Sequence, residues 1–106
     1  MTVGIARLTL FLPGSHSLKE KRMVLRRVKD RVRAKFNAAV AEVEDNDVWQ
    51  KAVMGFAVVG NDERFVGGAL DEVIRFVEGE AEVTNVERDV QTFGDELASS
   101  FKHWEP

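Results

Sequence analysis

Apolar and polar residues alternate along the first stretch of the chain, residues 3–12. This period of two predicts a β-strand with one buried face and one open face. The next two residues, Pro13 and Gly14, predict the end of that strand. Its two faces carry Ala6, Leu8, Leu10 and Leu12 on one side and Ile5, Arg7, Thr9 and Phe11 on the other.

The apolar period then changes to three or four residues, which predicts an amphipathic helix from Leu18 to about Phe36. Ser17 precedes Glu20 by three positions, the spacing of a capping box at a helix start. The sequence therefore marks the beginning of this helix more sharply than its end.

Three further strands are predicted from alternation and β-branched content. The second covers about Ala38 to Glu44 and is followed by turn residues 45–47, and the third covers about Trp49 to Val59. Residues 81–93 alternate again and predict the fourth strand.

A second helix is predicted between the third and fourth strands. Asp62 supplies a cap, the apolar positions of helical spacing begin at Val66, and Gly79 closes the helix. Because the pair Gly67-Gly68 is unfavourable inside a helix, we expect either a late start or close packing on the sheet.

The order β-α-β-β-α-β predicts an α+β fold, the ferredoxin-like sandwich. Right-handed crossovers give a four-stranded antiparallel sheet of order 4-1-3-2, with two helices on one face. Residues 1–93 are expected to form this domain. Residues 94–106 are a C-terminal tail, in which Leu97, Phe101 and Trp104 have the spacing of a short amphipathic helix.

The opposite face of the sheet is a possible interface. We expect it to present Phe11 from the first strand with Met54, Phe56 and Val58 from the third. Exposed aromatics on central strands stack on bases in RNA-recognition domains. That signal is weak here, because an apolar sheet face is more often buried by homodimerisation or by a C-terminal segment.

Composition limits the compartment and the chemistry. The chain has 106 residues, 44% hydrophobic and 31% charged, with no cysteine, so disulfides and thiolate sites are excluded. No apolar run approaches the length of a membrane span, and the N-terminus lacks a basic leader. We therefore expect a soluble cytoplasmic protein without a membrane partner.

Charge is distributed unevenly along the chain. The net charge is −3, yet residues 19–35 hold nine Lys or Arg against two acidic residues, so the remainder carries −10. Spacings of three and four place five cations on one side of the first helix. Such a ladder suits the phosphates of a nucleic acid, and the alternative is a solvated face that pairs with acids or a second subunit. This cationic stripe comprises Lys19, Arg22, Arg26, Lys29 and Arg33.

The loop before the first helix offers two interpretations. Ser15, His16 and Ser17 adjoin a helix N-terminus, a possible anion site, but Ser17 and Glu20 also satisfy the cap themselves. His16 is one of only two histidines and no metal-binding spacing exists, so we predict no metal, cofactor or catalytic residue. Trp49 is expected to be partly buried at the end of the sandwich, with a ligand platform as the alternative.

Several stretches together resemble the YlxP-like family, a small bacterial family of unknown function. They are Ser15-His16-Ser17-Leu18-Lys19-Glu20-Lys21-Arg22, Arg33-Ala34-Lys35-Phe36-Asn37, Ala41-Glu42-Val43, Asp47-Val48-Trp49-Gln50-Lys51-Ala52 and Val58-Val59-Gly60-Asn61-Asp62. The resemblance covers about residues 3–90, and Gly60 departs from it where a serine is expected. The resemblance implies a ferredoxin-like fold and supplies no accepted activity. It also implies a genomic setting among translation genes, since members of the family lie beside initiation factor two and ribosome-binding factor A in some bacteria.

These observations favour a non-enzymatic protein that binds RNA or the ribosome through its first helix. Enzymes on this fold that hold phosphate with an arginine in the first loop, the acylphosphatases, find no counterpart, because residues 13–17 include no arginine. The alternative function is a protein-interaction or homodimerisation module that acts through the open sheet face.

Overall fold

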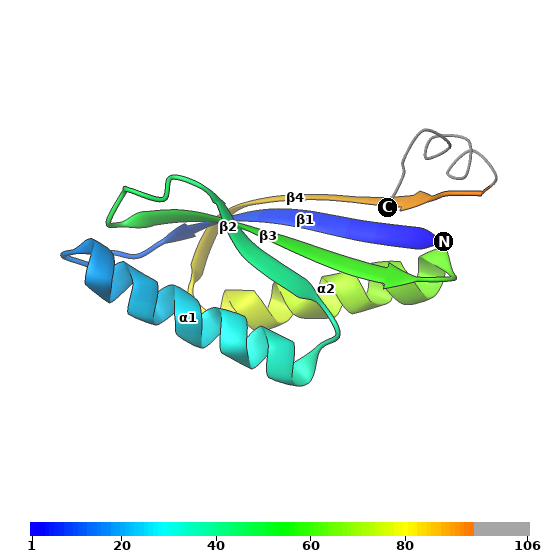
Figure 1. Ribbon diagram of the computed structural model, residues 1–106, viewed down its shortest axis with the longest axis horizontal. Coiled ribbons are helices and arrows are strands. Elements are labelled where there is room, and N and C mark those ends of the chain that lie inside the picture. The colour runs from blue at the N-terminus through cyan, green and yellow to red at the C-terminus, as the bar shows by residue number, and fades with distance from the viewer. Residues whose placement is uncertain (95–106) are drawn as a thin grey trace, which may run out of the picture.

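The computed structural model describes residues 1–94, and these form two layers (Figure 1). The predicted element order is confirmed. The elements are β1 (Thr2–Phe11), α1 (Leu18–Lys35), β2 (Ala39–Glu44), β3 (Lys51–Gly60), α2 (Glu63–Glu80) and β4 (Glu82–Thr92).

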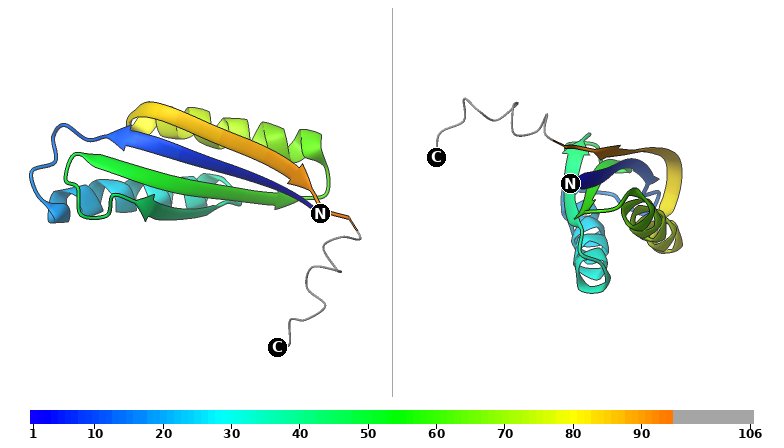
Figure 2. Two further views of the ribbon diagram at one scale, coloured as in Figure 1. Left: turned by 90° about the horizontal axis from the view of Figure 1, so that it is seen from above. Right: turned by 90° about the vertical axis from the view of Figure 1, so that its right-hand side faces the viewer.

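The four strands make one antiparallel sheet of order β2-β3-β1-β4. Each strand has the neighbours that the order 4-1-3-2 requires. Both helices lie on one face of the sheet, as Figure 2 shows, and within residues 1–94 no element covers the other face. The predicted ferredoxin-like topology is therefore confirmed.

The alternation of β1 sets which residues enter the core. Its even-numbered residues from Ala6 to Leu10 are buried under the helices, whereas Ile5 and Phe11 on the other side are exposed. Each helix contributes one apolar stripe to the same core, because its apolar residues recur with the helical period. The predicted faces of the first strand are confirmed.

The predicted orientation of β3 is wrong. Met54, Phe56 and Val58 were expected on the open face, but all three are buried in the core. The reason is the register with β1, in which Phe56 stands opposite Ala6 and residues directly opposite share a face. Both faces of β3 are apolar, so its own sequence does not distinguish them. The open face instead receives the small residues Gly55 and Ala57.

The start of β3 differs from expectation, whereas the start of α2 agrees with its predicted cap. β3 begins at Lys51 rather than Trp49, because residues 45–50 form a turn in which the Val48 N–H donates to the Asp45 carbonyl. α2 begins at Glu63, directly after the predicted cap Asp62, and runs through Gly67-Gly68 without a break. The tertiary contacts of α2 offset the low helix propensity of these glycines.

The tail prediction falls on residues outside the described part of the chain. Leu97, Phe101 and Trp104, expected to form a short amphipathic helix, are all among them. Within residues 1–94 neither helix is long and apolar enough to cross a membrane.

Candidate nucleic-acid interface

α1 begins with the predicted capping box. The Ser17 hydroxyl accepts from the Glu20 N–H at 3.1 Å, and the Glu20 carboxylate accepts from the His16 N–H at 2.6 Å. Two N–H groups at the helix start are thus satisfied by the chain itself. The carboxylate of Glu20 occupies the place that an anion requires, and Ser15 is buried. The arrangement is that of a helix cap. It favours the capping interpretation of this loop over the anion site predicted at Ser15, His16 and Ser17.

The cationic stripe lies on the flank of α1 that faces β2. Arg33, at its C-terminal end, donates to the Val40 carbonyl of β2 at 3.0 Å. The opposite flank faces α2, where Arg31 pairs with Glu80. Because residues three and four apart share one side of a helix, the other members of the stripe follow the Arg33 side.

Most of the stripe carries unpaired charge. Within residues 1–94, none of its five members forms an ion pair. Lys29 is half-buried, and Lys19, Arg22 and Arg26 are exposed. Beyond its first turn, α1 has one acidic residue, Asp30. The charge of the stripe is therefore available to an external anion in the described part of the chain.

Lys21 differs from its cationic neighbours because it points into the protein. Its side chain is 1% exposed, its Nζ donates to the Asp45 carbonyl at 2.6 Å, and it lies 2.8 Å from Oε2 of Glu42. Sequence analysis missed this role. A signal exists, since Lys21 shares the helical phase of the buried Leu25 and Val28.

The β2–β3 turn is held firmly against the start of α1. Asp45 has a φ of 59°, and its carbonyl accepts from both Val48 N–H and the Lys21 ammonium. At the other end of the turn, the Gln50 carbonyl accepts from the Leu12 N–H at 2.9 Å. The turn is thus fixed to both α1 and β1.

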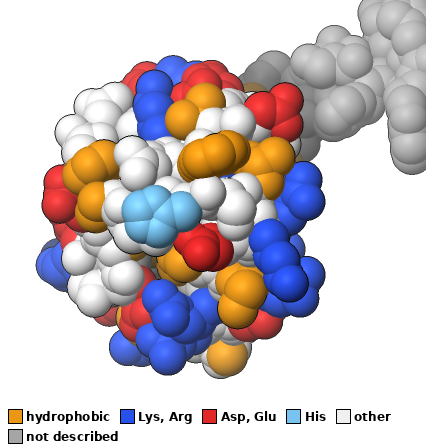
Figure 3. All heavy atoms as spheres, turned by 90° about the vertical axis from the view of Figure 1, so that its left-hand side faces the viewer, with side chains coloured by type: hydrophobic (Ala, Val, Ile, Leu, Met, Phe, Trp, Pro, Cys, Tyr) orange, Lys and Arg blue, Asp and Glu red, His pale blue; other side chains and the backbone are white. Residues whose placement is uncertain are grey.

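Trp49 is exposed on this fixed turn. Trp49 is about half buried, in line with the expected partial burial, because 53% of it remains accessible, and its neighbour Val48 is also exposed. Figure 3 shows this end of the molecule, where hydrophobic side chains lie among lysine and arginine side chains. His16 belongs to the same end, but residues 1–94 contain no cluster of three or more His, Asp or Glu side chains suited to a metal ion.

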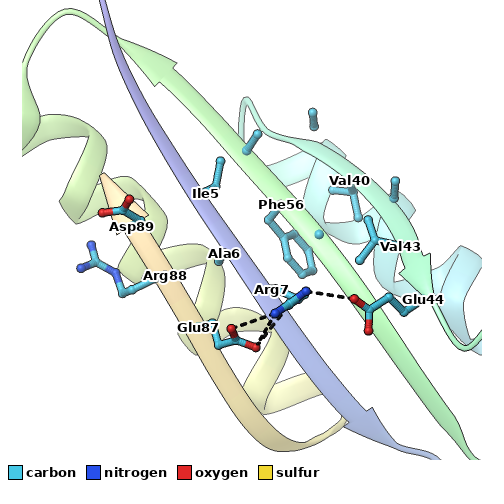
Figure 4. A pocket seen from close by; sticks show the side chains of 14 residues that line it. Ile5, Ala6, Arg7, Val40, Val43, Glu44, Phe56, Glu87, Arg88 and Asp89 are labelled. Carbon is cyan, nitrogen blue, oxygen red and sulfur yellow. Dashed lines mark hydrogen bonds and ion pairs between the residues drawn. The ribbon is translucent and has the colours of Figure 1, made fainter. Parts of the chain in front are cut away.

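The open sheet face forms a shallow hollow of about 690 Å³ (Figure 4). Small residues of the two strands β2 and β3 make its floor, and Arg7 of β1 crosses it. Because Arg7 stands opposite Gly55 in the register, its side chain reaches across β3 to Glu44 at 2.9 Å. It also pairs with Glu87 of β4 at 2.9 Å. The apolar residues that line it are Ile5, Ala6, Ala39, Val40, Ala41, Val43, Phe56 and Ala57.

In this hollow the charge of Arg7 is shared between two carboxylates, those of Glu44 and Glu87. The Arg7 guanidinium donates to both oxygens of Glu87, and these hydrogen bonds together with its positive charge lower the pKa of the Glu87 carboxyl. The same pairing raises the pKa of Arg7. Of the predicted interface residues only Phe11 is exposed, because Met54, Phe56 and Val58 face the helices. The aromatic platform expected on this face is therefore absent within residues 1–94.

Comparison with known proteins identifies a family whose function is unknown. The model of the family described as "Protein of unknown function (DUF503)" matches residues 3–90. An uncharacterised protein, YlxP of Bacillus subtilis (strain 168), is 33% identical over 81 residues, which are 76% of this chain and 88% of the relative.

Solved structures that resemble this chain include two designed proteins. One is the design Foldit4, with 13% identity, a TM-score of 0.51, and coverage of 88% of this chain and 98% of the design. The other is LFR1 1, a design with a ferredoxin fold, with 16% identity, the same TM-score, and coverage of 88% and 87%. At this identity the likeness supports the fold alone.

Proposed function

The chain belongs to the YlxP-like DUF503 family, whose function is unknown, and we propose that it is a non-enzymatic binding protein for structured RNA. The binding element is the cationic stripe of α1. Ribosomal RNA is the proposed target, because the family resemblance implies a genomic setting among translation genes. The cytoplasm is the proposed compartment.

The observation that supports this proposal is the unpaired charge of the stripe. The side chains of four of its members, Lys19, Arg22, Arg26 and Lys29, form no hydrogen bond or ion pair within residues 1–94. A row of cations on a rigid helix matches the regular spacing of backbone phosphates, and each contact releases counterions. Phosphate contacts give affinity with little sequence readout.

A salt titration tests the proposal. Fluorescence anisotropy on a ribosomal RNA fragment, repeated at several salt concentrations, gives the slope of log K against log salt. The slope reports the number of phosphates neutralised, and the double variant Arg22→Glu, Arg26→Glu should reduce its magnitude by about two.

A matched control has the same charge change elsewhere. Arg64 and Arg75 of α2 are exposed, and their side chains form no ion pair within residues 1–94. The double variant Arg64→Glu, Arg75→Glu should bind RNA with a nearly unchanged slope. Affinity that ignores salt, or equal loss in both double variants, contradicts the proposal.

A second candidate function, homodimerisation, is favoured by the apolar hollow on the open sheet face. Ile5, Val43 and Val59 are each about half exposed there, and a contiguous apolar patch is typical of an interface. Light scattering over a range of concentrations tests it, with Ile5→Asp as the disrupting variant. A monomer at every concentration rules out this candidate without affecting the RNA proposal.

A further inference from the structure

The exposed Trp49 is the feature that the proposed cationic interface does not yet use. We propose that Trp49 stacks on an unpaired base of the RNA whose phosphates lie along the cationic stripe. The target is then a helical stem with a bulged or looped nucleotide beside it, rather than a uniform duplex. This inference rests on the proposed function.

The first argument is the exposure of Trp49. A tryptophan that is 53% accessible leaves a large apolar ring in water, although tryptophan is usually highly buried on average. Unpaired bases stack on such rings, and every base has a face suited to this contact. An exposed ring near a cationic helix therefore matches single-stranded nucleotides.

The second argument is the rigidity of the turn that carries Trp49. The Lys21 ammonium and the Val48 N–H both bind the Asp45 carbonyl, and Leu12 N–H binds the Gln50 carbonyl. The backbone on both sides of Trp49 is thus fixed before any ligand arrives. A preorganised aromatic side chain loses little conformational entropy when it binds.

The third argument is the position of the turn next to the stripe. Lys21 joins the turn to the first part of α1, and its chain neighbour Arg22 belongs to the stripe. The turn that carries Trp49 and the N-terminal part of α1 therefore lie at the same end of the molecule (Figure 1). A nucleotide carries its base and its phosphate together, so a strand whose phosphates follow the stripe can present a base to this turn.

The turn holds two acidic residues, Asp45 and Asp47, and they differ in how strongly they repel RNA phosphates. The Asp45 carboxylate pairs with Lys51 at 3.1 Å, whereas Asp47 has no ion pair within residues 1–94. Asp47 is therefore the carboxylate of the turn that no cation neutralises within residues 1–94. The variant Asp47→Asn should bind RNA more tightly by a small factor, about twofold, because an exposed like charge is removed.

The experiment compares a fully paired RNA duplex with the same duplex carrying an adenosine bulge. In the Trp104→Phe background, Trp49 is the sole tryptophan, and its fluorescence should be quenched by the bulged duplex. In that background, Trp49→Ala should weaken binding to the bulged duplex about tenfold, the scale of one aromatic–base stack. Trp49→Phe should retain most of the affinity, and circular dichroism should give an unchanged fold.

A matched control is an equally exposed aromatic at the other end of the molecule. Phe65 is 64% exposed at the start of α2 beside Gly60, away from the β2–β3 turn (Figure 1). Phe65→Ala should leave both affinities unchanged. Equal loss in Phe65→Ala and Trp49→Ala overturns the inference.

The outcomes separate this inference from the proposed function. If both RNAs bind with a strong salt dependence but Trp49→Ala binds the bulged duplex as tightly as its parent does, the stripe binds RNA and the stacking inference is wrong. Trp49 then serves another contact, such as a protein partner. If neither RNA binds in a salt-dependent way, the proposed function fails and this inference fails with it.

Discussion

The ammonium group of Lys21 lies 2.8 Å from the carboxylate of Glu42 and joins the core side of α1 to β2. Lys21 is 1% exposed, and its second partner is the carbonyl of Asp45. It stands between Lys19 and Arg22, which carry their charge into solvent. The same basic segment thus contains one structural cation among several available ones.

Replacement of Lys21 by methionine should destabilise the fold. The change keeps the length of the side chain but leaves the Glu42 carboxylate and the Asp45 carbonyl without their cation. A lost partner of a buried pair has an effect of about 3 kcal/mol, which urea unfolding will measure. Lys19→Met, an exposed control, should change stability by about 0.5 kcal/mol or less. Equal effects of the two variants contradict the structural role of Lys21.

α2 packs closely against β1 at Gly4. A Cβ added there lies 2.8 Å from a methyl carbon of Val66 and 3.3 Å from one of Leu70, both fully buried. Since these neighbours have no free space, Gly4→Ala should lower the free energy of unfolding by about 1–3 kcal/mol.

The control for Gly4→Ala is the same substitution at Gly68 in α2. Nothing lies within 4 Å of a Cβ at Gly68, so Gly68→Ala should stabilise the helix by about 0.5–1 kcal/mol. The midpoint of thermal unfolding should therefore fall for Gly4→Ala and rise for Gly68→Ala. A shift in the same direction for both would show that α2 is not packed on Gly4 in this way.

The orientation of β3 can be tested with two phenylalanines. Phe56 faces the helices and is buried, whereas Phe11 is on the open face and is exposed. Phe56→Ala should therefore lower the free energy of unfolding by about 3–5 kcal/mol, and Phe11→Ala by much less. Urea unfolding of both variants measures the difference. The reverse order would place Phe56 on the open face after all.

The Arg7–Glu87 pair predicts a pH-dependent contribution to stability. Because Arg7 lowers the pKa of Glu87 in the folded protein, the contribution is complete above the ordinary glutamate pKa of about 4.3 and disappears as pH falls through the lowered value. Glu87→Gln should thus shift the urea midpoint at neutral pH and have no effect in strong acid. The shift should be small, because both side chains are about half exposed.

The matched control for that pair is Glu82→Gln. Glu82 is exposed on the same strand, and within residues 1–94 it forms no ion pair. The urea midpoint of the Glu82→Gln variant should match that of the wild type both at neutral pH and in strong acid. An NMR titration should give Glu87 a carboxyl midpoint below the ordinary glutamate value, and an ordinary midpoint contradicts the prediction.

The sequence by itself determined the features that depend on local pattern. The element order, the buried face of β1 and the capping box of Ser17 and Glu20 follow from period and spacing alone. The topology followed because few arrangements satisfy right-handed crossovers. The position of the cationic stripe on one flank of α1 was also predictable, since helical geometry fixes which residues share a side.

Tertiary structure decided the features that depend on a partner distant in sequence. The orientation of β3 is set by its register with β1, because both of its faces are apolar. Lys21 is buried because Glu42 and Asp45, more than twenty residues away in the chain, satisfy its charge. Trp49 lies on a turn whose position is set by hydrogen bonds to α1 and β1. Such contacts form only when the chain is folded, so no local pattern records them.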